Sequence, residues 1–127
     1  MECFEGHRAL FRPLARPALT IGNFDGVHLG HQALLSRTRA AADQSDGDAV
    51  VMTFEPHPAT FLAPDRVPPR LSSVARKLEL LSAAGMTVTL LEEFDEDFAR
   101  ISARHFEEEI LAGILGVEHV VVGLDLR

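Results

Sequence analysis

The stretch "TIGNFDGVHLGHQALL", residues 20–35, changes in character from strand to helix within a short distance. Its apolar, β-branched start predicts a buried strand, and the spacing of apolar residues from His31 onward predicts a helix. Three glycines lie between the two, at positions 22, 26 and 30. Glycine lets the backbone turn tightly and approach a ligand, and the free amides of a helix N-terminus attract anions. The stretch therefore predicts a strand that ends in a phosphate-binding turn.

The rest of the chain repeats this alternation of strand and helix. Apolar segments typical of buried strands are "AVVMTF" (49–54), "MTVTLL" (86–91) and "HVVVGL" (119–124), in addition to "ALTIGNF" (18–24). Helical spacing is found in residues 31–43, 74–85 and 103–116, with Ser73 and Ser102 as expected N-caps and Gly85 and Gly116 as expected C-caps. Strands this apolar are covered on both faces. We therefore expect an α/β fold, an open parallel sheet with helices on both faces.

Composition narrows the class of protein. A chain of 127 residues with 46% hydrophobic content suits one domain with a substantial core. Its formal charge of -7 argues against binding of nucleic acid by bulk electrostatics. The charges scattered through the N-terminal segment argue against a signal peptide or a membrane span. The single cysteine, Cys3, favours a reducing compartment, so we expect a cytoplasmic protein without nucleic-acid or membrane partners.

His28 and His31 are the distinctive residues of the first turn. Imidazole groups donate hydrogen bonds to phosphate oxygens, and two of them three residues apart across a helix start can converge on one phosphate. The turn lacks the residues that define the dinucleotide-binding and Walker motifs. A zinc site would need a third ligand, for which His57 is a candidate, and a role in capping alone is the remaining alternative. We assign no metal-binding residue.

Residues 55–73, "EPHPATFLAPDRVPPRLSS", are the one long segment without helix or strand character. Long irregular segments in compact domains are commonly functional. Prolines on both sides of His57 restrict the backbone, which would present this histidine from a stiff loop. The acidic segment "EEFDEDF" (92–98) lacks the spacing of a calcium-binding loop and is interpreted as a solvated acidic turn.

The motif "GNFDGVHLGHQALL" resembles the "G-x-F-D-G-x-H-x-G-H" signature of the bacterial bifunctional riboflavin kinase/FAD synthetase family. The segments "VVMTFEPHP", "PPRLSSVARKLELL", "FDEDFARISARHFEEEIL" and "LGVEHVVVG" are similar to that family in the same order. The resemblance runs from about Leu14 to Gly123 and concerns the N-terminal FMN adenylyltransferase module. It implies a Rossmann-like nucleotidylyltransferase fold of the "HxGH" kind.

The resemblance also implies an activity and roles for single residues. Members transfer AMP from ATP to FMN, giving FAD and pyrophosphate, with Mg²⁺ accompanying ATP and without a covalent enzyme intermediate. By the same match, the catalytic residues would be His28 and His31, and the nucleotide-binding residues Gly22, Phe24, Asp25, Gly26 and Gly30. The flavin- and phosphate-binding residues would be Asn23, Pro56, His57, Pro58, Arg70 and Asp125.

This chain departs from the family pattern after its last expected strand. The family continues with a stretch like "D-F-x-F-G", whereas here "LDLR" follows. We therefore expect residues 1–127 to form a single, C-terminally incomplete adenylyltransferase-like domain without the riboflavin kinase domain, and to self-associate through an exposed sheet edge. The alternatives are an inactive nucleotide- or flavin-binding fragment and another "HxGH" nucleotidylyltransferase.

Overall fold

The computed structural model describes the whole chain except residues 23, 25–28, 56–73, 94 and 122–127. Its strands are β1 (Glu2–Phe4), β2 (Ala18–Ile21), β3 (Ala49–Phe54), β4 (Val88–Glu92) and β5 (His119–Val121). Its helical segments are η1 (His7–Ala9), α1 (Leu29–Gln44), α3 (Val74–Ala83), α4 (Glu96–Ala99) and α5 (Ala103–His105), the last of which runs directly into the π-helical segment η3 (Phe106–Ile114). In these described residues, no helix has the length and apolar character that crossing a membrane requires.

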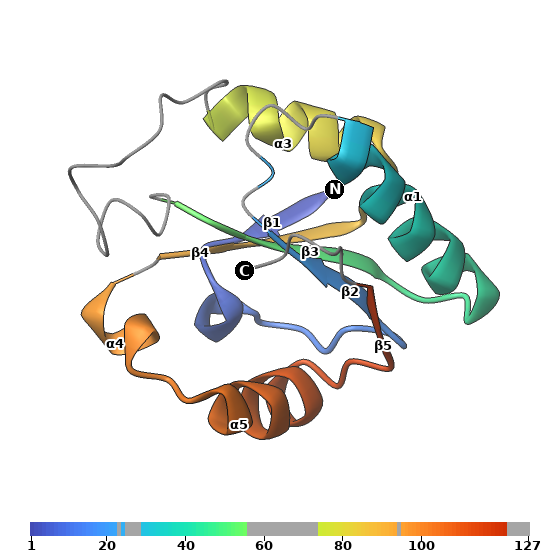
Figure 1. The fold of residues 1–127 in the computed structure, drawn as a ribbon. Helices are drawn as coiled ribbons and strands as arrows, with labels where there is room; N and C mark the ends of the chain where they lie inside the picture. The colour runs from blue at the N-terminus through green and yellow to red at the C-terminus, as the bar shows by residue number, and fades with distance from the viewer. Residues whose placement is uncertain (23, 25–28, 56–73, 94, 122–127) are drawn as a thin grey trace.

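The described strands form one parallel sheet in the order β1-β4-β3-β2-β5. Helices α1 and α3 cover one face, and α4 and α5 lie on the other (Figure 1). This arrangement confirms the expected open parallel sheet with helices on both faces. Edge strand β1 was not expected, because "ECF" is short and charged and its pairing with β4 involves residues far apart in the sequence.

The two faces of the sheet carry side chains of different size. Large residues, among them Leu19, Met52 and Leu90, lie on the face of the sheet that packs against η3, the segment that contains Ile110. The opposite face presents smaller residues, among them Ala18, Ala49 and Val51, and packs with Leu35 of α1. Small side chains let a helix lie close to a sheet, and close packing of this kind excludes water from both layers. The alternation along each strand thus produces two separate cores.

The ends of the helices follow their capping residues. The Ser102 hydroxyl accepts a hydrogen bond from the His105 amide at 3.1 Å, which confirms it as an N-cap. Gly85 and Gly116 have φ of 93° and 62°, a backbone region that favours glycine, as expected of C-caps. Ser73 lies outside the described residues. Asp95 accepts from the Phe98 amide and starts α4, so this part of the acidic segment forms a short helix rather than a turn.

Arg12 joins the start of the chain to the amino end of β3. Its guanidinium lies 2.5 Å from a Glu2 carboxylate oxygen and 3.2 Å from one of Asp48. Asp48 also accepts hydrogen bonds from the Ala15 amide and from the Thr87 hydroxyl. Burial raises the pKa of the Asp48 carboxyl, but the hydrogen bonds from Arg12, Ala15 and Thr87 outweigh it, so this pKa lies below its usual value of 3.8. The charged form of Asp48 therefore stabilises the fold.

Asp48→Asn is expected to lower the free energy of unfolding at neutral pH by about 1–3 kcal/mol, because charge-assisted hydrogen bonds are lost. Since the folded-state pKa of Asp48 lies below the unfolded value, its stabilising contribution is complete above about pH 4 and is lost as the pH falls through the folded-state pKa. Urea unfolding of both proteins along an acid series measures this. The stability difference should shrink toward acid pH; a constant difference from neutral pH to pH 2 would contradict the prediction.

Candidate functional site

The carboxyl ends of β2, β3 and β4 meet at one edge of the sheet. Beyond β2, the Gly22 amide donates a hydrogen bond to the Met52 carbonyl at 3.1 Å. Beyond β3, the Glu55 amide donates to the Glu92 carbonyl at 2.9 Å. In open parallel sheets, ligands bind outside the carboxyl ends of the strands. The region at the carboxyl ends of these strands, formed by residues 22, 55 and 92, is called the carboxyl edge below. It is distinct from the two edge strands, β1 and β5.

Phe24 and His31 connect the carboxyl edge to the start of α1. The Phe24 ring is completely buried in the core beside α1 and α3, and its centroid lies 4.9 Å from that of the half-buried His31 ring. His31 belongs to the first turn of α1, which also contains Gly30. The aromatic contact therefore orients an imidazole beside a helix N-terminus, where exposed amides favour anions.

Gly22 is adapted to the position of the Phe24 ring. A Cβ atom at residue 22 would lie 2.9 Å from the nearest ring carbon of Phe24, closer than side chains approach one another. Phe24 itself has φ 53°, a backbone region that bulky residues rarely adopt. Glycine at residue 22 thus leaves room for a ring whose backbone is already constrained.

Four of the residues expected at the site are among those that the structure describes, and the Phe24 ring lies beside both Gly22 and His31. Gly22 and Phe24 follow β2, and Gly30 and His31 lie at the start of α1. The other expected site residues lie outside the described residues: Asn23, Asp25, Gly26, His28, Pro56, His57, Pro58, Arg70 and Asp125.

Lys77 is a buried residue of this region that the sequence analysis missed. It lies in α3 with 2% of its side chain exposed, and its ammonium group donates to the Thr53 hydroxyl at 2.9 Å. The same group lies 3.5 Å from a Glu55 carboxylate oxygen. Its position four residues before the buried Leu81 was the available signal, because residues i and i+4 share a helix face.

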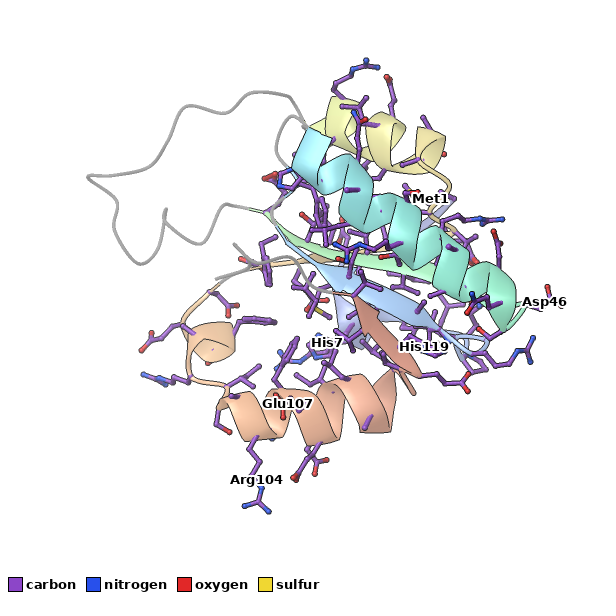
Figure 2. All side chains as sticks on the ribbon, turned by 45° about the vertical axis from the view of Figure 1, so that its right-hand side comes forward. Met1, His7, Asp46, Arg104, Glu107 and His119 are labelled. Carbon is purple, nitrogen blue, oxygen red and sulfur yellow. The ribbon has the colours of Figure 1, made fainter. Side chains whose placement is uncertain are left out.

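His7 and Glu92 form a second buried pair, on the opposite face of the sheet. The His7 ring nitrogen Nδ1 lies 2.6 Å from Glu92 Oε1, and the His7 amide donates to Glu92 Oε2. Both side chains are 4% exposed. Figure 2 shows His7 on the side of the sheet that faces the helix carrying Glu107. Both oxygens of the Glu92 side chain at the end of β4 are thus contacted by His7 of segment η1, which the sequence pattern did not predict.

The described part of the chain does not assemble three or more His, Cys, Asp or Glu side chains in a group able to hold a metal ion. The acidic residues at the carboxyl edge are engaged with bases instead. Glu55 pairs with Lys77 on the face covered by α3, and Glu92 pairs with His7 on the other face. The carboxyl edge therefore combines paired carboxylates with a helix N-terminus that carries a histidine.

In this parallel α/β sheet, β2 is followed along the chain by a helix with a histidine in its first turn, as expected of a nucleotidylyltransferase-like domain. A family model described as FAD synthetase matches residues 6–127, and the chain belongs to this family. The resemblance seen in the sequence is thereby confirmed.

Several bacterial proteins described as bifunctional riboflavin kinase/FMN adenylyltransferase are similar to this chain. The one from Escherichia coli strain K12 is 40% identical over 109 residues, which cover 86% of this chain and 35% of the relative. The one from Haemophilus influenzae is 36% identical over 127 residues, which cover all of this chain and 41% of the relative. The chain thus spans well under half the length of these relatives.

The fold is also similar to that of a solved structure. The crystal structure described as a macrolide-efflux protein from Streptococcus pneumoniae matches with a TM-score of 0.81 and 25% sequence identity. The match covers 97% of this chain and 40% of that one. The likeness supports the α/β fold described above.

His7→Ala is expected to lower the free energy of unfolding by about 3 kcal/mol, because it removes the ring that contacts the buried Glu92 carboxylate. His105→Ala, at an exposed position of α5, is the control and should change stability by less than about 0.5 kcal/mol. Urea unfolding at neutral pH measures both. Equal stability of the two variants would show that the pair contributes nothing.

Gly22→Ala is expected to displace the Phe24 ring and with it His31, since the added methyl group would lie 2.9 Å from the ring. The expected loss of stability is about 1–3 kcal/mol, as for other overpacked sites. NMR chemical shifts of the His31 ring report its displacement. Gly113→Ala, in η3, is the control. Unchanged His31 shifts in Gly22→Ala would reject the coupling between these residues.

Proposed function

We propose that this protein is an FMN adenylyltransferase that transfers AMP from ATP to FMN, giving FAD and pyrophosphate. The observation that carries the proposal is the match of residues 6–127 to the FAD synthetase family. The relatives named above support it, since their description includes FMN adenylyltransferase. The contact between the Phe24 and His31 rings, close to Gly22 at the carboxyl end of β2, also supports the proposal, because parallel sheets bind ligands beyond the carboxyl ends of their strands.

In the proposed reaction, a phosphate oxygen of FMN attacks the α-phosphorus of ATP. A new P–O bond joins the two phosphates, the bond from the α-phosphorus to the oxygen bridging to the β-phosphate breaks, and pyrophosphate leaves with that electron pair. The protein aligns two anions and stabilises charge on the transferred group. His31, in the first turn of α1, would donate a hydrogen bond to that group, and we propose His28 as the second donor.

The remaining site residues are proposed from the family resemblance. Nucleotide binding is assigned to Gly22, Phe24, Asp25, Gly26 and Gly30, and contacts to the flavin and its phosphate to Asn23, Pro56, His57, Pro58, Arg70 and Asp125. Mg²⁺ is proposed to arrive with ATP, where it would neutralise phosphate charge. It prefers phosphate oxygens and water to an all-protein cage, and the described residues offer no such cage.

Two further proposals concern the surroundings of the protein. The single Cys3 is an exposed free thiol, which supports a reducing compartment and thus the cytoplasm.

Strand β5 lies at an edge of the described sheet, and Val120 on it is 47% exposed, which supports self-association through this edge. Sedimentation equilibrium over a range of concentrations tests the latter, and a monomer throughout would contradict it.

His31→Ala and His28→Ala are each expected to lower kcat for FAD formation by about 100-fold, because the lost donors act on charge that grows in the transition state. FMN binding, measured by flavin fluorescence, should weaken by less than about threefold. His105→Ala is the control for loss of a histidine outside the site. Losses of equal size in binding and turnover would reject the catalytic assignment.

The same assay separates the proposed function from the alternatives. A binding module would bind ATP and FMN without forming FAD. Another "HxGH" transferase would form product only when FMN is replaced by a different phosphorylated acceptor.

A further inference from the structure

Lys77 is buried, although a lysine in a surface helix normally reaches water with its ammonium group. Its neighbour Arg76 is exposed and pairs with the exposed Glu79. Lys77 instead points from α3 to the end of β3, where it donates to the Thr53 hydroxyl and to the Phe54 carbonyl. Burying an ammonium group is costly unless hydrogen bonds and an opposite charge compensate for it. The Lys77 ammonium group is therefore held at the carboxyl end of β3, where these groups compensate for its burial.

The opposite charge is supplied by Glu55, a residue of the carboxyl edge. Its carboxylate lies 3.5 Å from the Lys77 ammonium group and is 15% exposed, while its amide is bound to the Glu92 carbonyl of β4. Thr53, which also binds Lys77, lies on β3 two residues before Glu55, just before the strand ends. The Lys77 ammonium group therefore contacts three successive residues at the end of β3, Thr53, Phe54 and Glu55.

A negative charge at the carboxyl edge conflicts with the ligands expected there. ATP, FMN and pyrophosphate are all anions, and like charges in a partly buried site repel strongly. The partner of Glu55 comes from α3, on the same face as the α1 N-terminus and His31 (Figure 1). Glu92, on the other face, is likewise held by His7.

We propose that Lys77 is a positioning residue that anchors and neutralises the Glu55 carboxylate at the carboxyl edge, so that phosphate-bearing substrates can bind there. The inference rests on the proposed function for the identity of those substrates. It assigns Lys77 no contact with the reacting atoms. Its effect is exerted through Glu55, and removal of the Glu55 charge should make the Lys77 charge dispensable for binding.

Three variants test this inference. Lys77→Met removes the ammonium group and keeps most of the apolar stem. Lys77→Met combined with Glu55→Gln removes both charges, and Arg76→Met removes an exposed cation from the same helix as a matched control. For each protein, the dissociation constant of ATP is measured by calorimetry, KM and kcat for FAD formation by flavin fluorescence, and stability by urea unfolding.

Lys77→Met is expected to weaken ATP binding and to raise KM for FMN by about tenfold, with a smaller change in kcat, because the Glu55 charge is then compensated less and repels both anions more strongly. The double variant should return both values to within about threefold of the original protein. Arg76→Met should leave them unchanged.

A purely structural role for Lys77 gives a different pattern. Lys77→Met would then lose stability while binding ATP normally, or the double variant would regain stability without regaining ATP binding, and either result overturns the inference. If the unaltered protein binds ATP but forms no FAD, the proposed function is refuted. Calorimetry of ATP binding to the variants still decides the role of Lys77 in that case. A protein that binds neither ATP nor FMN overturns both.

Discussion

The parallel pairing of β3 between β2 and β4 is the constraint on which the candidate site depends. Its register aligns Ile21 with Met52 on one side and Glu92 with Phe54 on the other. Three chain segments that are distant in sequence therefore leave the sheet at one edge. A shift of one residue in this register would turn Thr53, and with it the hydroxyl that binds Lys77, toward the other face. The pairing of these three strands, more than any local motif, thus brings the polar groups at their carboxyl ends together.

Strand β2 and helix α1 were predictable because their signals are local. Glycines at positions 22 and 30, an apolar strand before them and a helix after them require no knowledge of distant residues. The same holds for Ser102, which caps a helix with its own hydroxyl group, and for Gly85 and Gly116, whose backbone adopts a positive φ. The family resemblance then gave these local features a chemical meaning that spacing alone could not supply.

Features that depend on distant partners were missed. Strand β1 is short and charged, and it becomes a strand only because β4 offers an edge to it. His7 and Lys77 were not recognised because single charged or polar residues are ordinarily solvated, and their acidic partners are distant in the sequence. Propensity and periodicity describe the chain near one residue and contain no information about which carboxylate it will meet after folding.

The connection of the N-terminal segment to β4 has a consequence for the order of folding. His7 and Glu92 are separated by 85 positions, and β1 pairs with the same late strand. During synthesis, which proceeds from the N-terminus, this segment has no native partner until β4 has been made. Contacts between such distant positions also slow folding, because a long loop must close before they form. The segment that contains β1 and His7 therefore reaches its native position late in folding.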